Sequence, residues 1–205
     1  MFEDITSLDN IFSAWRIFRL RKRARSDVQL FERHLEDNLF ALHDELKSKR
    51  YRHGFYERFH LFDPKHRIIH KAEVRDRVVH HTVYRILAPL FEQSFIFDSY
   101  SCRLDKGTHA GVDRVEQFAR KVSRNYTRTC YALKCDIRKF FDSIDHRILM
   151  NIIARRISDQ NTLWLLQEII ESYPVILRER ERESKRASDR KPYLPAVCQF
   201  VYERV

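Results

Sequence analysis

The stretch Lys134–His146, with the sequence KCDIRKFFDSIDH, carries one acidic residue at the end of an apolar strand and then leads into a helix. The alternation in Tyr131–Ile137 predicts a strand whose apolar side chains share one face, with Asp136 emerging on the opposite face. A hard cation such as Mg²⁺ prefers carboxylate and carbonyl oxygens. Asp136 and the backbone carbonyl of Ile137 are therefore candidate metal ligands.

The turn after this strand has the composition of a nucleotide site. Backbone amides at Lys139 and Phe140, where the chain leaves the strand, could cradle a triphosphate. Phe141 is bulky enough to lie under a sugar and exclude a 2′-hydroxyl. For the acids further on we prefer a structural interpretation, in which Asp145, or else Asp142 or Ser143, caps the next helix.

Upstream, the pattern predicts a β-hairpin formed by Phe55–Leu61 and Arg67–Ala72, joined through an Asp-Pro turn. Lys65 and Arg67 flank that turn, so their cations could reach a bound triphosphate, although two such cations alone would usually be solvated surface. In the following helix, His80 and His81 are adjacent and cannot share a face. We expect one packed and one exposed histidine rather than a metal pair, and we expect Asp76 to favour the helix dipole.

The rest of the chain is mostly helical. Ser7 is expected to cap a short helix that includes Ile11, Trp15 and Phe18, and one long amphipathic helix is expected over positions 28–46. Further helices are expected around 79–90, ending near Pro89, then around 112–122, 148–153 and 163–170. The fold class predicted is therefore mixed α/β (α+β), without repeats.

Composition limits the function classes. The net charge of +10 favours a polyanionic partner such as nucleic acid, and the basic run Arg19, Arg21, Lys22, Arg23 suits phosphates, although a solvated face would look the same. Only 3 glycines are present, which excludes a glycine-rich phosphate loop. The four cysteines have no zinc spacing, the N-terminus is acidic, and no apolar run could span a bilayer. These features predict a cytoplasmic protein with reduced thiols and no membrane partner.

Taken in order and spacing, these motifs resemble the reverse transcriptases of bacterial retroelements, and most of all the group II intron and diversity-generating branch. The resemblance runs from about Leu8 to Tyr173. It is carried by Phe62–Ile69 (FDPKHRII), by Asp76–His81 (DRVVHH), by Asp98–Arg103 (DSYSCR) with Lys106–His109 (KGTH), and by Asp136–His146. Diversity-generating members commonly carry proline where this chain has Asp142, so the branch stays open.

The resemblance implies a right-hand polymerase fold, with a basic N-terminal helix extension at 1–26, fingers at 27–129 and a partial palm at 130–177. It implies that Asp136 binds Mg²⁺ and that the complete enzyme uses two such ions. It also implies that Phe141 is the sugar gate, which excludes a 2′-hydroxyl. Lys65 and Arg67 would contact the triphosphate, and Arg77 and Arg103 would lie along the template. The implied partners are an RNA template, a DNA or RNA primer, deoxynucleotides and an accessory protein of the retroelement.

After Tyr173 the family pattern stops. The family continues with a Gly-Leu-Pro-x-Gly-Asn stretch and a Tyr-x-Asp-Asp hairpin, neither of which occurs in this sequence. In a shifted reading frame, however, codons from Arg186 onward permit the string GLPIGNLTSQLFVNLYMNE at nineteen consecutive positions. We therefore expect a frameshift, biological or from sequencing, between about Tyr173 and Arg186, an aberrant tail at 178–205, and a chain that does not polymerise DNA by itself.

Three functions compete at this point. The first is an RNA-directed DNA polymerase that joins a primer 3′-hydroxyl to a deoxynucleotide by two-metal phosphoryl transfer. The second is a non-catalytic RNA-binding module built from the basic helix and the fingers. The third is an RNA-templated RNA polymerase, against which Phe141 argues because a bulky gate disfavours ribonucleotides.

Overall fold

A computed structural model describes residues 1–62, 66–101, 103–137, 140 and 144–173. Eight helices and one two-stranded sheet are found in these ranges. They are α1 (Phe2–Thr6), α2 (Leu8–Phe18), α3 (Ser26–Glu32), α4 (Leu35–Lys47), β1 (Glu57–Leu61), β2 (Arg67–Lys71), α5 (Val74–Glu92), α6 (Thr108–Val122), α7 (His146–Ala154) and α8 (Gln160–Glu171). The mixed α+β class predicted from the sequence is confirmed.

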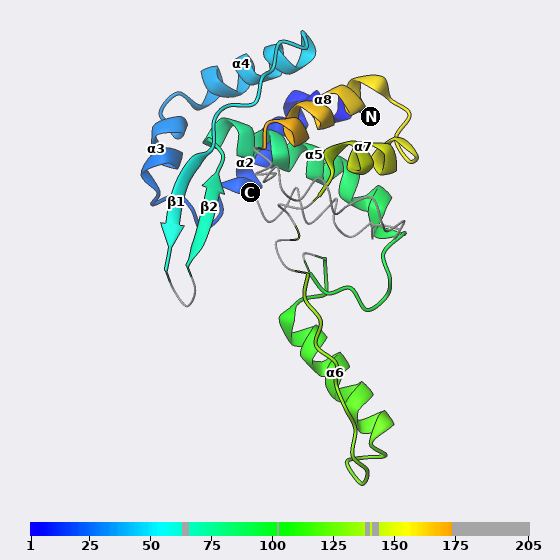
Figure 1. Ribbon diagram of the computed structural model, residues 1–205. Helices are drawn as coiled ribbons and strands as arrows, with labels where there is room; N and C mark the ends of the chain where they lie inside the picture. Colours follow the sequence, from blue (N-terminus) through cyan, green and yellow to red (C-terminus); the bar gives the residue numbers. More distant parts are fainter. Residues whose placement is uncertain (63–65, 102, 138–139, 141–143, 174–205) are drawn as a thin grey trace, which may run out of the picture.

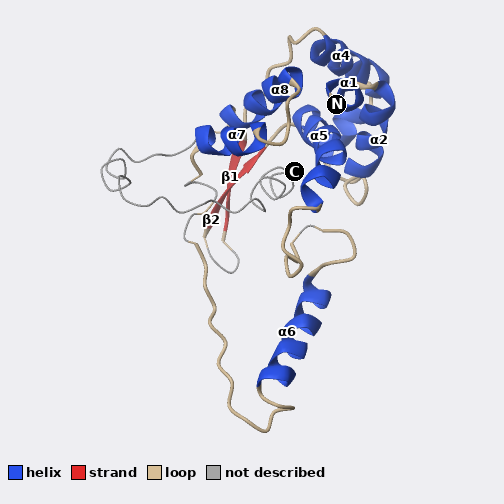
Figure 2. Ribbon diagram, turned by 90° about the vertical axis from the view of Figure 1, so that its right-hand side faces the viewer, coloured by secondary structure: helices blue, strands red, loops and turns tan. Residues whose placement is uncertain are grey.

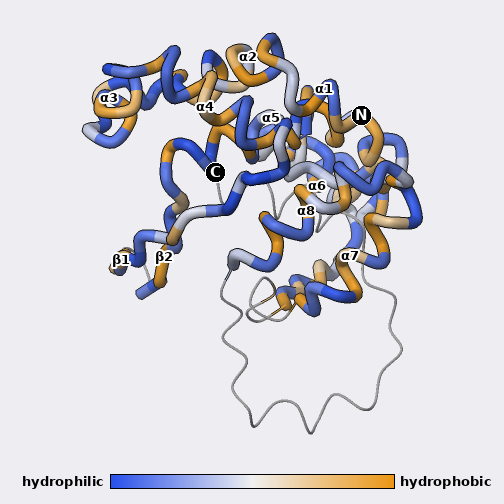
Figure 3. Tube along the Cα trace, turned by 90° about the horizontal axis from the view of Figure 1, so that it is seen from above, coloured by the Kyte–Doolittle hydropathy of each residue, from blue (hydrophilic) through white to orange (hydrophobic). Residues whose placement is uncertain are grey.

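Helix α5 is the centre of the core. Helices α1, α2 and α3 pack against it, α4 packs on α2, and α7 pairs with α8 (Figures 1 and 2). The alternation of hydrophilic and hydrophobic residues along α4 and α7 can be followed in Figure 3. One continuous apolar cluster joins these helices and includes the fully buried Trp15, Phe18, Leu42, Val78 and Ile153. Burial of this apolar surface is the main force that holds the helices together.

Several local predictions hold. The Ser7 hydroxyl accepts a hydrogen bond from the Asn10 amide and caps α2, as expected. Asp145 caps α7 by accepting from the amides of Arg147 and Ile148. The two strands pair antiparallel as a hairpin, with Phe59 opposite Ile69 and Leu61 opposite Arg67.

The long helix predicted over 28–46 was wrong, because the chain breaks into α3 and α4 at Arg33 and His34. No glycine or proline marks the break. The side-chain amide of Asn38, in α4, donates to the carbonyl of Phe31 at 2.9 Å and so satisfies an acceptor at the end of α3. That bond offsets part of the cost of interrupting the helix.

Two other expectations also need correction. Helix α5 does not end near Pro89 but continues to Glu92, since the burial of Leu87 and Phe91 on either side outweighs the one backbone bond that proline removes. Residues 131–137 form no strand within the described ranges but run as exposed coil, with Tyr131 95% and Leu133 90% exposed. A strand is stable only when a neighbouring strand pairs with it, and the described residues supply none here.

Helix α6 stands apart from the other helices in Figures 1 and 2, and none of its residues is buried. Among the described residues, no helix combines the length and apolarity needed to cross a membrane.

Candidate functional site

The β1–β2 hairpin carries the cation that the sequence assigns to a triphosphate. Arg67 is the first residue of β2 and is exposed. Its expected companion Lys65 lies outside the described residues. The contacts at the base of the hairpin determine how Arg67 is held relative to the body, and they come from two sides.

On one side, Asp27 of α3 anchors the hairpin. Its carboxylate binds the ammonium of Lys71, the last residue of β2, at 2.9 Å, and it also binds the guanidinium of Arg77 in α5. Partial burial works to raise the pKa of Asp27, but the hydrogen bonds from Lys71 and Arg77 outweigh it and lower that pKa to about 2. Asp27 therefore stays ionised and joins α3, β2 and α5.

On the other side, the hairpin rests on the end of α8. The hydroxyl of Tyr56, just before β1, lies 3.3 Å from the Ser172 hydroxyl. The Tyr173 hydroxyl lies 3.2 Å from Nδ1 of His70 in β2, and the two rings meet edge to face. The two sides together fix the base of the hairpin, so the direction in which its strands project follows from tertiary contacts.

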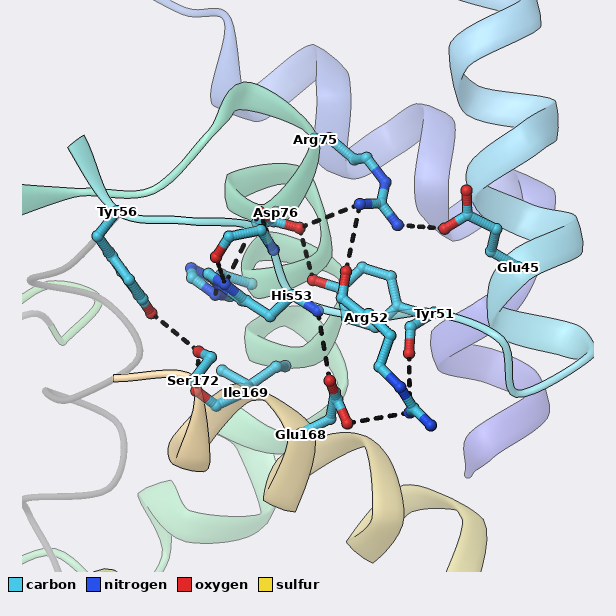
Figure 4. A network of polar contacts seen from close by, with 12 residues as sticks. Glu45, Tyr51, Arg52, His53, Tyr56, Arg75, Asp76, Glu168, Ile169 and Ser172 are labelled. Carbon is cyan, nitrogen blue, oxygen red and sulfur yellow. Dashed lines mark hydrogen bonds and ion pairs between the residues drawn. The ribbon is translucent and has the colours of Figure 1, made fainter. Parts of the chain in front are cut away.

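A buried polar network supports the segment that leads into β1 (Figure 4). The Asp76 carboxylate, which is fully buried, accepts hydrogen bonds from the Tyr51 hydroxyl at 2.8 Å and from the Gly54 amide at 3.0 Å. Burial first, and then the adjacent Asp76, raise the pKa of Tyr51 well above its usual range. Sequence reasoning gave Asp76 only a role at the helix dipole. The sequence carries no local signal that tells this buried acid from an ordinary acid in the first turn of a helix.

A stacked histidine pair adjoins this network. Nε2 of His53 lies 3.1 Å from Nε2 of His80, and the rings are 5.1 Å apart. Burial, and then the nearby His53, lower the pKa of His80 to about 3. His81 is half-buried rather than exposed, which corrects that expectation, and burial lowers its pKa to about 4. Both neutral histidines belong to the packing of α5.

The basic segment after α2 has paired and unpaired members. Arg19 forms an ion pair with Glu32. The Lys22 ammonium lies 4.3 Å from the centre of the Phe18 ring, and burial, followed by the charges of Arg77 and Arg25, lowers its pKa. Arg21 and Arg23 are exposed, and no hydrogen bond or ion pair is found for their side chains in the described part of the chain. Arg21 and Arg23 are therefore available to a polyanion.

The two arginines assigned to the template are engaged within the protein. Arg77 is 3% exposed and faces Asp27, with its guanidinium 5.0 Å from the centre of the Phe18 ring. Arg103 is 10% exposed, pairs with Glu92, and donates to the carbonyls of Ile96 at 2.9 Å and Ser99 at 3.0 Å. In this structure both hold the protein together, and a contact of either with a template stays a prediction.

Asp136 lies in exposed coil, next to Ile137, which is 65% exposed. Phe140 is half-buried in a turn, whereas Lys139, Phe141, Asp142 and Ser143 lie outside the described residues. The described ranges contain no group of three His, Cys, Asp or Glu side chains that could hold a metal ion. Asp136 has the oxygen chemistry that Mg²⁺ takes, but the described residues do not complete a magnesium site around it.

No protein-family model matches this chain. It is 28% identical over 145 residues to "Protein YkfC" of Escherichia coli, which covers 70% of the chain and 38% of that protein. It is 28% identical over 103 residues to "Nuclear intron maturase 1, mitochondrial" of Arabidopsis thaliana, which covers 49% of the chain and 14% of that protein. It is 25% identical over 97 residues to the "Putative COX1/OXI3 intron 2 protein" of Saccharomyces cerevisiae, which covers 47% of the chain and 10% of that protein.

The chain thus spans well under half the length of each of these relatives. Two of the three are named for introns and one of them as a maturase. These similarities relate the chain to intron maturases, at low identity and over part of its length.

Proposed function

We propose that this chain is the fingers and first palm segment of an RNA-directed DNA polymerase of a retroelement, in the group II intron or diversity-generating branch. The observation that carries the proposal is the hairpin: it presents Arg67 and is anchored on both sides, by Asp27 and by the end of α8. The motif order in the sequence and the intron-related relatives support the same assignment.

In this proposal each part of the chain has a role in holding substrates. Arg67, with Lys65, neutralises the triphosphate of a deoxynucleotide, and a rigid hairpin base reduces the reorganisation that this requires. Asp136 supplies one carboxylate toward magnesium, and Phe141 lies under the sugar. Two-metal catalysis needs several carboxylates around the ions, and the described residues contain no group of three side chains that could hold a metal ion. We therefore assign no catalytic step to this chain alone, and we expect it to be inactive.

The experiment is primer extension with an RNA template, deoxynucleotides and Mg²⁺. Purified residues 1–205 should give no product. A frame-restored protein should extend the primer, its Asp136→Ala variant should lose synthesis while retaining RNA binding, and an Asp113→Ala variant, changed at an exposed acid of α6, should be unaffected. Extension by residues 1–205, or by the Asp136→Ala variant, would contradict the proposal.

A second candidate is a non-catalytic RNA-binding module, and the exposed Arg21 and Arg23 favour it. Phosphate contacts of this kind give binding that weakens as salt rises. Replacing both arginines by alanine should reduce RNA affinity. It should also lower the number of counterions released on binding, measured from the salt dependence of that affinity, by about two. The matched control changes Arg155 and Arg156, which are exposed at the end of α7. If the frame-restored protein binds RNA but never extends a primer, this second candidate is the correct one.

A further inference from the structure

Three aromatic rings lie parallel near the turn of the hairpin. The His60 and His66 rings are 5.0 Å apart with planes 3° apart, and the Phe62 and His66 rings are 4.9 Å apart with planes 20° apart. His60 and Phe62 are also parallel within 19°, at 6.2 Å. The imidazoles are linked by a hydrogen bond of 2.7 Å between Nδ1 of His60 and Nε2 of His66. We call His60, Phe62 and His66 the ring cluster.

The ring cluster is exposed, although phenylalanine is a side chain that proteins usually bury. Phe62 is 74% exposed, and both histidines are exposed. Rings that are already parallel offer their π-faces to a further planar group without reorganising. A flat, polarisable partner would therefore gain contact area at little cost in side-chain entropy.

The strand register places the ring cluster on one face of the hairpin. Arg58 and His60 alternate with Phe59 along β1, so Arg58 shares the face of His60, while Phe59 lies on the opposite face. The one acid among the described residues of the hairpin, Glu57, is also on that opposite face and pairs with Lys71. The face of the ring cluster thus combines aromatic rings with a cation and, among its described residues, no carboxylate.

We propose that the ring cluster stacks an unpaired nucleobase of single-stranded RNA, with Arg58 available to the adjoining phosphate. A nucleobase is planar and every base has a π-face, so such a site binds RNA with little preference for sequence. The cation beside the rings matches the charge of the RNA backbone. This inference rests on the proposed function, because it names how the hairpin would hold RNA.

The test uses residues 1–205 and a single-stranded RNA of about 12 nucleotides that carries 2-aminopurine, with affinity measured by anisotropy. Phe62→Leu should weaken binding about tenfold and should reduce the quenching of 2-aminopurine that stacking causes. Phe59→Leu is the matched control, since it makes the same change on the opposite face of the hairpin, and it should leave affinity unchanged. Phe62→Trp should preserve both the affinity and the quenching.

The outcomes separate this inference from the proposed function. If the chain binds RNA and both Phe62→Leu and Phe59→Leu leave its affinity unchanged, the stacking site is wrong while the RNA-binding function stands. If the wild-type chain and the frame-restored protein both fail to bind RNA, the proposed function fails with it. If both leucine variants weaken binding equally, Phe62→Trp decides: retained affinity and quenching in that variant support the inference, and their loss overturns it.

Discussion

The carboxylate of Asp27 pairs with the guanidinium of Arg77, a side chain that is 3% exposed, and through the same oxygen it binds Lys71 at the end of β2. One acid in α3 thus neutralises a buried cation of the central helix and fixes the hairpin to it. A buried charge without a partner is costly, so this pairing is a condition for Arg77 to occupy the core.

Replacing Asp27 by asparagine should therefore destabilise the fold. We expect a loss of about 2 kcal/mol, less than for a fully buried pair because Asp27 is partly exposed. Denaturant unfolding followed by circular dichroism measures it. Glu116→Gln, which removes a surface partner of Arg120 in α6, is the control and should give no measurable change. Equal midpoints for the two variants would show that Asp27 has no such role.

Gly54→Ala should disturb the network around Asp76. A Cβ at this position would lie 2.9 Å from Oδ2 of Asp76, the oxygen that the Gly54 amide binds. Either the hydrogen bond from the Gly54 amide or the hydrogen bond from the Tyr51 hydroxyl to Asp76 must lengthen. We expect this to cost about 1–3 kcal/mol of folding free energy because the carboxylate is buried. Gly107→Ala is the matched control, since its Cβ would meet nothing within 4 Å. The same free energy of unfolding for both variants would contradict the assigned role of Gly54.

The buried histidines of α5 predict that the protein loses stability in acid. In the unfolded chain His80 has a pKa near 6.5, and in the folded protein burial lowers that pKa to about 3. Between these values the unfolded state binds more protons, so stability is present above pH 6.5 and is lost as the pH falls toward 3. His81 contributes in the same direction down to about pH 4.

The expected slope is on the order of 1 kcal/mol per pH unit for each histidine within its window. It is measured by urea unfolding at several pH values. His80→Gln should reduce the slope between pH 6.5 and 4, whereas His109→Gln, at an exposed position in α6, should leave it unchanged. An unaltered slope in the His80→Gln variant would show that this histidine is not the titrating group.

The nucleotide sequence of the locus tests the frameshift. The shifted frame should encode the string GLPIGNLTSQLFVNLYMNE, followed by a Tyr-x-Asp-Asp run, and resequencing would show whether the shift is biological. If that frame is interrupted, or lacks the Tyr-x-Asp-Asp run, the tail after Tyr173 is a natural divergent sequence and the frameshift idea is wrong. The tail itself, 178–205, lies outside the described residues.

The local elements could be predicted from the sequence because their signals are local. A cap at Ser7, the helical spacing after it, and the turn between two alternating segments lie within a few residues of the structure that they specify. The same locality explains the errors. No glycine or proline marks the break between α3 and α4, where the hydrogen bond from Asn38 to Phe31 offsets part of the cost. The segment 131–137 has strand composition but no partner strand among the described residues.

The sequence by itself determined the fold class, most of the helices, the hairpin and the retroelement-like order of motifs. Only the tertiary structure decided that Asp27 anchors the hairpin, that Asp76 is buried between Tyr51 and Gly54, and that His60, Phe62 and His66 lie parallel. The physical reason is distance along the chain. Asp27 and Arg77 are 50 residues apart, and no local pattern encodes a pairing whose free energy arises only when the core brings the two together.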